Sequence, residues 1–369
     1  MGITVMGGRS DIIIVGGGII GLSVALELKM RGASVTVLSR HSQQAAGYVG
    51  AGMLAPQAER IPPSPLRDLA LRSRSLYEGW TQKLEAITGS DAGYWPCGIL
   101  APVYDRPESV ELPQTPDSPA IWLEGAELDE HQPGLSSEVA GAWWFPKDAQ
   151  VDNRRHLMRS LLSAARELGV DVQEGVAVKD IVTDGKAVQN VATDGGAIAG
   201  YHYILAAGAW CGQLLSIPVR PIKGQMLSLR VPDSVPKLPV RQVLFGSGIY
   251  IVPRRDGLIV LGATVEDVGF DNSLTPAGID TLLSEAMRLY PGLRDFPIQE
   301  FWWGFRPTTP DELPILGPSP FPNLTLATGH HRNGILLAPA TAEIVADWVY
   351  SGRADPLIGH FRWNRFSKS

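Results

Sequence analysis

The clearest pattern of apolar and polar positions lies near the start of the chain. Residues 12–15 (IIIV) are four consecutive β-branched residues, typical of a buried strand in a parallel sheet. Apolar residues then recur at helical spacing over 22–28, and 33–38 (ASVTVL) predicts a second strand. Three glycines in the spacing G-x-G-x-x-G separate the first strand from the helix. In such a strand–turn–helix–strand unit of about 30 residues, this spacing predicts a dinucleotide site.

Each glycine has a physical role in such a site. Gly16 permits the tight turn, Gly18 lets a pyrophosphate approach the backbone, and Gly21 lets the helix pack close to its strand. Ser39 ends the second strand, where such sites usually carry an acid for the ribose hydroxyls. Its hydroxyl can still bond a ribose oxygen, but the following Arg40 could instead favour a 2′-phosphate. This unit alone is therefore compatible with either FAD or NADP as the cofactor.

A second strand–glycine–helix unit near the C-terminus bears on that choice. A strand over 324–328 ends in Gly329, and an apolar helix is expected over 335–349. The N-terminus of a helix carries about half a positive charge, which would stabilise the negative ring of a reduced flavin. An NADP enzyme has no comparable need, so this unit favours FAD. The segments 43–56 and 206–210, rich in small residues, are further places where the backbone could approach a flat ligand.

The middle of the chain predicts a different kind of sheet. Short apolar runs separated by turn residues over 225–263, followed by 301–307, indicate an antiparallel sheet. Besides the last helix, helices are expected over residues 66–87, 121–133 and 275–289.

Composition narrows the class of protein. The 369 residues, 44% of them hydrophobic, suffice for two domains, and a net charge of −6 argues against a nucleic-acid surface. No apolar run is long enough to span a membrane, and residues 1–10 resemble a frayed leader rather than a signal peptide. Cys97 and Cys211 form no C-x-x-C pair, so neither a metal site nor a redox dithiol is expected. A cytoplasmic enzyme without membrane or nucleic-acid partners fits these features.

Five segments together resemble the D-amino-acid oxidase and glycine oxidase family of FAD-dependent amine oxidases, and most closely its glycine oxidases of thiamine biosynthesis. Besides the first glycine turn they are 45–56 (AAGYVGAGMLAP), 250–254 (YIVPR), 302–317 (WWGFRPTTPDELPILG) and 329–341 (GHHRNGILLAPAT). The resemblance runs from Asp11 to the end of the last predicted helix. The resemblance also implies that the protein forms a homo-oligomer, namely a tetramer.

The resemblance also implies the fold. We expect an α/β FAD-binding domain of the Rossmann-like, glutathione-reductase type, built from residues 1–80, 145–220 and 305–369. We expect an α+β substrate domain with an antiparallel sheet, built from residues 81–144 and 221–304.

The implied reaction is the oxidation of glycine and other small amines or D-amino acids. Hydride would pass to flavin N5, giving an imine, then glyoxylate and ammonia, while oxygen becomes hydrogen peroxide. The imine, dehydroglycine, would supply the thiazole of thiamine. Related sarcosine oxidases attach FAD through a cysteine near the C-terminus; this chain has none after Cys211, so we expect non-covalent FAD. Two alternatives are a dehydrogenase that passes electrons to a quinone and a non-catalytic NADP-binding module.

Candidate site residues follow from the motifs and the resemblance. Arg306 could grip a substrate carboxylate through two parallel bonds, with help from Tyr250, while Met53 and Arg332 border the substrate. No residue is assigned as a catalytic base, because hydride transfer from a neutral amine needs no positioned proton acceptor. No metal ligands are expected. The expected cofactor contacts are Gly16, Gly18, Ile19, Ile20, Gly21, Ser39, Arg40, Ala46, Gly47, Ala51, Gly52, Met53, Val178, Ala207, Gly208, His330, His331, Arg332, Asn333, Gly334, Ile335 and Leu336.

Overall fold

The computed structural model describes residues 11–107 and 119–366, so the predicted leader over 1–10 lies outside the described residues. The strands are β1 (Ile12–Val15), β2 (Val35–Ser39), β3 (Met53–Leu54), β4 (Tyr94–Trp95), β5 (Ile99–Val103), β6 (Ile121–Leu123), β7 (Gly141–Phe145), β8 (Ala149–Val151), β9 (Asp171–Glu174), β10 (Val178–Thr183), β11 (Val188–Thr193), β12 (Gly196–Ile198), β13 (His202–Leu205), β14 (Arg220–Arg230), β15 (Val243–Phe245), β16 (Tyr250–Pro253), β17 (Leu258–Gly262), β18 (Ile298–Thr308), β19 (Ile315–Pro318) and β20 (Leu324–Thr328).

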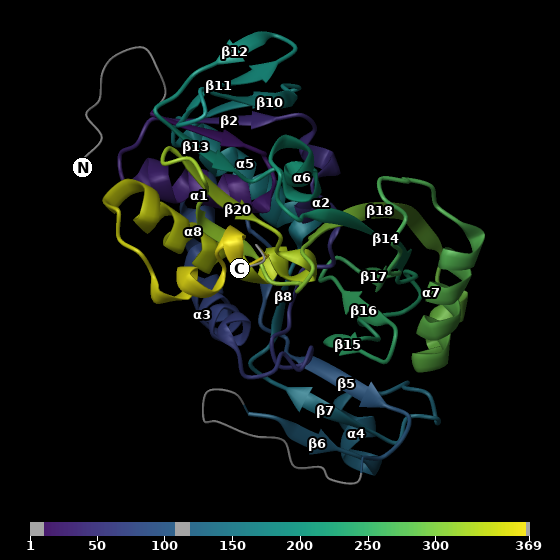
Figure 1. Cartoon of the computed structure of the whole chain (residues 1–369). Coiled ribbons are helices and arrows are strands. Elements are labelled where there is room, and N and C mark those ends of the chain that lie inside the picture. Colours follow the sequence, from purple (N-terminus) through teal and green to yellow (C-terminus); the bar gives the residue numbers. More distant parts are fainter. Residues whose placement is uncertain (1–10, 108–118, 367–369) are drawn as a thin grey trace.

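Along the chain, helices are interspersed among these strands (Figure 1). They are α1 (Ile19–Met30), α2 (Ala46–Val49), α3 (Pro65–Thr88), α4 (Gly125–His131), α5 (Met158–Glu167), α6 (Cys211–Leu214), α7 (Pro276–Leu289) and α8 (Gly334–Ser351). Shorter helical turns are η1 (Ser42–Gln44), η2 (Asn153–Leu157), η3 (Gly208–Trp210), η4 (Pro291–Asp295), η5 (His331–Asn333), η6 (Pro356–His360) and η7 (Trp363–Phe366).

A six-stranded sheet in the order β19-β20-β13-β1-β2-β9 gathers both ends of the chain. All its pairs are parallel except β19 with β20 at the edge. The predicted glycine turn follows β1 and has the expected close packing. Gly16 has φ +120°, and a Cβ on Gly21 would lie 1.9 Å from the Gly16 carbonyl oxygen. Only glycine therefore allows α1 to start this close to its strand.

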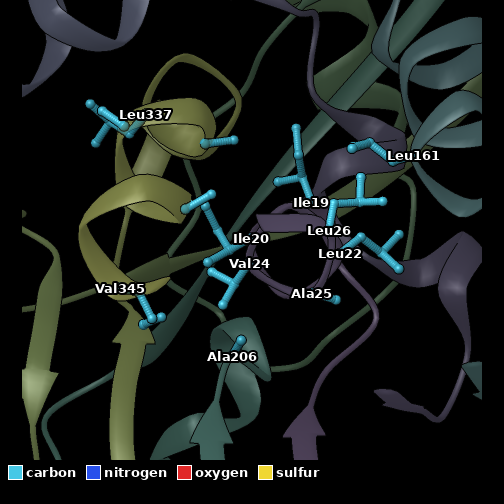
Figure 2. Close-up of a cluster of buried hydrophobic side chains, with 14 of the residues drawn as sticks. Ile19, Ile20, Leu22, Val24, Ala25, Leu26, Leu161, Ala206, Leu337 and Val345 are labelled. Atoms are coloured by element: carbon cyan, nitrogen blue, oxygen red, sulfur yellow. The ribbon is translucent and has the colours of Figure 1, made fainter. Parts of the chain in front are cut away.

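Helix α1 is buried between the sheet and two other helices. Figure 2 shows Ile20 and Val24 on the side of α1 that faces Leu337 and Val345 of α8, with Leu161 of α5 on another side. The first and last helices of the chain thus pack together, which holds both glycine turns at one edge of the sheet (Figure 1). Burying these aliphatic side chains contributes roughly 1.5–3 kcal/mol each.

The second large sheet has eight strands in the order β18-β14-β17-β16-β15-β5-β7-β6. Its pairs are antiparallel apart from β15 with β5, and α7 packs against it (Figure 1). The predicted fold class, an α/β unit with a parallel sheet beside a unit with an antiparallel sheet, is confirmed. The strands of the two sheets come from different segments of the chain, but the division into domains at the bounds given above stays a prediction.

One helix prediction is half wrong. The segment 121–133 begins as β6, in which Trp122 pairs with Trp143 of β7, and only Gly125–His131 are helical. At Trp122 a strand forms in place of the predicted helix, and its ring contacts that of Trp143, with centroids 5.3 Å apart. A cross-strand partner far along the chain decided this element, and local periodicity does not contain that information.

Candidate active site

One cavity of about 480 Å³ lies between the two sheets, within the usual size of ligand pockets. Its walls come from the first glycine turn, the segment 44–53, the segment 206–214, strands β14, β16 and β18, and the second glycine turn. All four predicted substrate residues line it, namely Met53, Tyr250, Arg306 and Arg332. The structure thus brings together residues that lie up to about 320 positions apart in the chain, between Gly16 and Ile335.

The predicted cofactor contacts line the same cavity with three exceptions. Gly21 lies beneath the turn against Gly16, in the packing role described above. Leu336 is buried in the core shared with α1. The side chain of Asn333 makes no capping bond at the start of α8, and the backbone N–H of Asn333 donates to the His330 carbonyl at 2.9 Å. For these three residues, and equally for those that line the cavity, a direct cofactor contact stays a prediction.

The glycine end of the cavity has the features of an anion site. Gly18 is the N-cap of α1, makes no side-chain cap, and has no acidic residue after it in the first turn. The amides at this helix start therefore lack side-chain acceptors. A Cβ on Gly18 would meet only Ala45 Cβ, at 3.6 Å, so the space beside it is open. Ser39 is buried, and its Oγ would lie 2.7 Å from a Cβ on Gly17.

Aromatic residues that were not predicted as site residues also line the glycine end of the cavity. The Arg40 guanidinium lies 4.6 Å from the centre of the Trp210 ring, and both residues line the cavity. Trp210 in turn stacks on Phe270 and meets the edge of Phe305. Arg40 is therefore held by a ring rather than by an acid.

A buried arginine fixes the wall beside Met53. Arg254, only 4% exposed, donates to the carbonyl oxygens of Ala51 (2.7 Å) and Val151 (3.1 Å) and to Gln150 Oε1 (2.7 Å). Burial lowers the pKa of Arg254. The YIVPR segment contains this residue, but its three partners lie elsewhere in the chain.

Replacing Arg254 with methionine should lower the free energy of unfolding by about 3–5 kcal/mol, because three buried oxygen atoms lose their donor. Urea denaturation of the purified protein measures this. Arg255→Met is the matched control, since the Arg255 side chain is 58% exposed and lies 4.0 Å from its acidic partner Asp91. Equal losses in the two variants would contradict the role of Arg254.

Arg306 and Tyr250 reach the cavity from β18 and β16, two strands of the antiparallel sheet that are separated by β14 and β17. Arg306 Nη1 donates to the carbonyls of Lys223 (3.2 Å) and Thr264 (3.0 Å), which fixes one edge of the guanidinium. Burial raises the pKa of Tyr250, although the charge of Arg306 works in the opposite direction. Two glycines make room: a Cβ on Gly224 would lie 2.6 Å from Arg306 Nη1, and one on Gly262 would lie 2.6 Å from Tyr250 Oη.

The two histidines of the second glycine turn are neutral at ordinary pH. Burial lowers the pKa of His330 to about 3 and that of His331 to about 4. His330 Nε2 lies 3.2 Å from Thr341 Oγ1, and His331 Nδ1 lies 2.7 Å from Thr308 Oγ1. Their hydrogen bonds thus hold the turn in place.

Glu59 is a cavity residue that the sequence did not indicate. Its Oε2 lies 3.4 Å from Arg332 Nε, and burial raises the pKa of its carboxyl. No motif surrounds Glu59 in the sequence, and its proximity to Arg332 depends on the tertiary fold.

Neither a metal-ligand cluster nor a membrane-spanning helix is found in the part of the chain that the structure describes. Residues 11–107 and 119–366 contain no group of three histidine, cysteine or acidic residues that could hold a metal ion. No helix within these ranges combines the length and the apolar character needed to cross a bilayer.

Comparisons with known proteins identify the family of the chain. The family model described as FAD dependent oxidoreductase matches residues 11–348. The chain is 57% identical over 361 residues to the bifunctional protein ThiO/ThiG of a Nostoc species, covering 97% of this chain and 55% of that protein. It is 36% identical to the glycine oxidase of Geobacillus kaustophilus, covering 92% of this chain and 93% of that enzyme.

The solved structure of the Geobacillus kaustophilus glycine oxidase matches with a TM-score of 0.88 and 32% identity, covering 98% of this chain and 100% of that one. The chain spans about half the length of the ThiO/ThiG relatives it matches. The glycine turns, the cavity between the sheets and these matches lead to one conclusion. The chain belongs to the FAD-dependent oxidoreductase family that includes the glycine oxidases, as the motifs predicted.

Proposed function

We propose that the protein oxidises glycine and other small amines at the carbon that bears nitrogen, with FAD as cofactor and oxygen as electron acceptor. The substrate loses two hydrogens and becomes an imine, which water converts to glyoxylate and ammonia, and oxygen becomes hydrogen peroxide. The observation that carries this proposal is the single cavity that joins two glycine turns to Arg306 and Tyr250. The glycine oxidase relatives support the same reaction.

The residues present fit FAD. The pyrophosphate would lie at Gly18 and the uncapped start of α1, and the ribose next to it near Ser39. The start of α8 likewise has no side-chain cap and no acid in its first turn. FAD supplies hydride acceptance when bound, and the helix N-terminus would favour a negatively charged ring. FAD attachment is proposed to be non-covalent.

The other end of the cavity fits a small carboxylate. The Arg306 guanidinium would hold it, and the Tyr250 hydroxyl would donate a further bond. Met53 would border the substrate from the segment that Arg254 holds. No base needs to be supplied by His330 or His331, whose ring nitrogens already face threonine hydroxyls.

Peroxide formation across a panel of small amines in air tests the proposed function. Glycine, sarcosine and small D-amino acids should give peroxide, and larger L-amino acids should not. Absence of peroxide with every amine, in a protein that retains FAD, would contradict the proposal.

A quinone-linked dehydrogenase acting on D-amino acids or a polyol phosphate is the second candidate. No apolar surface of the kind that such an enzyme needs is evident in the sequence. One loop of the structure, however, exposes Val265 (73%), Val268 (45%), Phe270 (36%) and Leu274 (39%). Val265 also lines the cavity. Faster reoxidation of the reduced protein by a soluble quinone than by oxygen would favour this candidate.

A single methyl group added beside Arg306 should disturb the binding of the substrate carboxylate. In Gly224→Ala the new Cβ would lie 2.6 Å from Arg306 Nη1, so the guanidinium must shift. We expect the KM for glycine to rise about tenfold or more, the size of effect that a misplacement of about 1 Å can have. Gly359→Ala is the control, since a Cβ there meets nothing within 4 Å. An unchanged KM in Gly224→Ala would contradict the placement of Arg306.

Three further features are proposed on the same grounds. The imine is proposed to supply the thiazole of thiamine, which the ThiO/ThiG names of the relatives support. The protein is proposed to act in the cytoplasm as a homotetramer. Sedimentation at several protein concentrations tests the tetramer, and a stable monomer would contradict it.

A further inference from the structure

The ion pair between Glu59 and Arg332 lies in the cavity wall, where a ligand would meet it. The Glu59 side chain is 12% exposed, whereas that of Arg332 is 49% exposed. A carboxylate so far withdrawn from water needs a cation beside it. Among the residues that the structure describes, Arg332 is the ion-pair partner of Glu59.

The backbone holds Glu59 in place without help from this pair. Its amide donates to the carbonyl of Ala55 at 3.0 Å, within one turn. In the same turn the Ala58 amide donates at 2.8 Å to Asp148, a fully buried carboxylate that Arg74 pairs at 2.6 Å. The backbone of Glu59 is therefore held and its side chain is mostly buried, whereas the half-exposed arginine has more room to move.

Three charges act on one another at this end of the cavity. Burial is the main cause that lowers the pKa of Arg306; the positive charge of Arg332 lowers it further, and the negative charge of Glu59 raises it. The same two arginines lower the pKa of Glu59 against the effect of its burial. Without Glu59, the cavity would present two unneutralised guanidinium groups to a ligand.

We propose that Glu59 restricts the substrate to amines with a single carboxylate, by holding Arg332 away from a second anionic group. The inference rests on the proposed function and adds a substrate class to it. Arg306 binds the one carboxylate, and a second carboxylate in the cavity meets the negative charge of Glu59 instead of a cation. Glu59 acts here through Arg332 and through its own charge; it takes no part in the chemical step.

The variant Glu59→Gln tests this with two substrates of similar shape. Sarcosine carries a methyl group on nitrogen, and iminodiacetate carries a carboxymethyl group there. The ratio of kcat/KM for iminodiacetate to that for sarcosine should rise about tenfold or more, as expected for one charge-assisted hydrogen bond to the released Arg332. The change should lie in KM rather than in kcat. An unchanged ratio would overturn the proposal.

Two controls separate this effect from a general disturbance. Glu343→Gln breaks a comparable pair, in which Arg72 Nη2 lies 3.3 Å from Glu343 Oε2 outside the cavity lining, and the ratio should stay that of the wild type. The double variant Glu59→Gln, Arg332→Gln should lose most of the gain, because only the repulsion by Glu59 is then removed and no released cation binds the second carboxylate. A gain that persists in full without Arg332 would contradict the mechanism.

A binding measurement makes the test independent of turnover. Acetate and malonate differ by one carboxylate, and each can be titrated against the flavin absorbance of the purified holoprotein. The preference for acetate over malonate should shrink about tenfold in Glu59→Gln. In Arg332→Gln acetate should bind more weakly, because Glu59 is left without its partner. Unchanged acetate binding in that variant would contradict the proposal even if Glu59→Gln failed to fold.

These outcomes are distinct from a failure of the proposed function. If the wild-type protein oxidised neither glycine nor sarcosine, the proposed function would be wrong. The comparison of acetate with malonate would still decide whether Glu59 sets the charge that the cavity accepts.

Discussion

Replacing Arg306 with alanine is expected to raise the KM for glycine about a hundredfold or more while FAD stays bound. The guanidinium lies in the cavity wall on β18, and a carboxylate held by two parallel charge-assisted bonds loses roughly 1.5–3 kcal/mol for each bond. FAD should remain because the glycine turns at the other end of the cavity are unchanged. Steady-state kinetics and the flavin absorbance of the same preparation measure both effects.

Arg220→Ala is the matched control for this variant. Arg220 also belongs to the β14–β18 pair, but its guanidinium pairs with Asp267 outside the cavity lining and is 54% exposed. Its KM for glycine should stay within about twofold of the wild type, as expected for an exposed ion pair. A lysine at position 306 should give an intermediate KM, because it keeps the charge and loses the paired geometry. An unchanged KM in Arg306→Ala would remove this residue from the substrate site.

Replacing Gly18 with leucine is expected to give a folded protein without FAD. Gly18 has φ −80° and ψ −177°, which any residue adopts, and its Cβ position is open apart from Ala45. The fold should therefore tolerate a side chain there. The same side chain would occupy the space beside the start of α1 where the pyrophosphate has to approach the backbone.

Substitutions at two other glycines distinguish a loss of FAD binding from a loss of folding. Gly79→Leu also enters open space, but on the exposed face of α3, and should remain yellow. Gly21→Ala would bring a Cβ within 1.9 Å of the Gly16 carbonyl and should impair folding itself. Circular dichroism and flavin absorbance report the two effects. A yellow Gly18→Leu protein would contradict the proposed pyrophosphate site.

Local patterns in the sequence predicted the framework of the site well. The Ile12–Val15 strand, its glycine turn and the apolar helix after Gly329 depend on neighbouring residues, so spacing alone indicated them. Their meeting at one cavity depends on α1 packing against α8, which local spacing did not contain. The family resemblance implied only that both ends of the chain belong to one FAD-binding domain. The exchange of a predicted helix for β6 has the same origin, since Trp122 takes its partner from another strand.

The residues that the sequence missed share one property: each acts through partners distant in the chain. Arg254 binds carbonyls about a hundred and two hundred positions away, and Glu59 pairs with Arg332. Trp210 gains its role from Arg40 and Phe305. No periodicity or motif marks such contacts, because they are decided by tertiary packing rather than by local sequence.

The decisive experiment is the reduction of bound flavin by glycine in the absence of oxygen. We expect the purified protein to be yellow, glycine to bleach its flavin absorbance without air, and oxygen to restore the colour with formation of peroxide. A flavin that stays oxidised with glycine and with every other small amine, or a purified protein with no flavin at all, would contradict the proposed function.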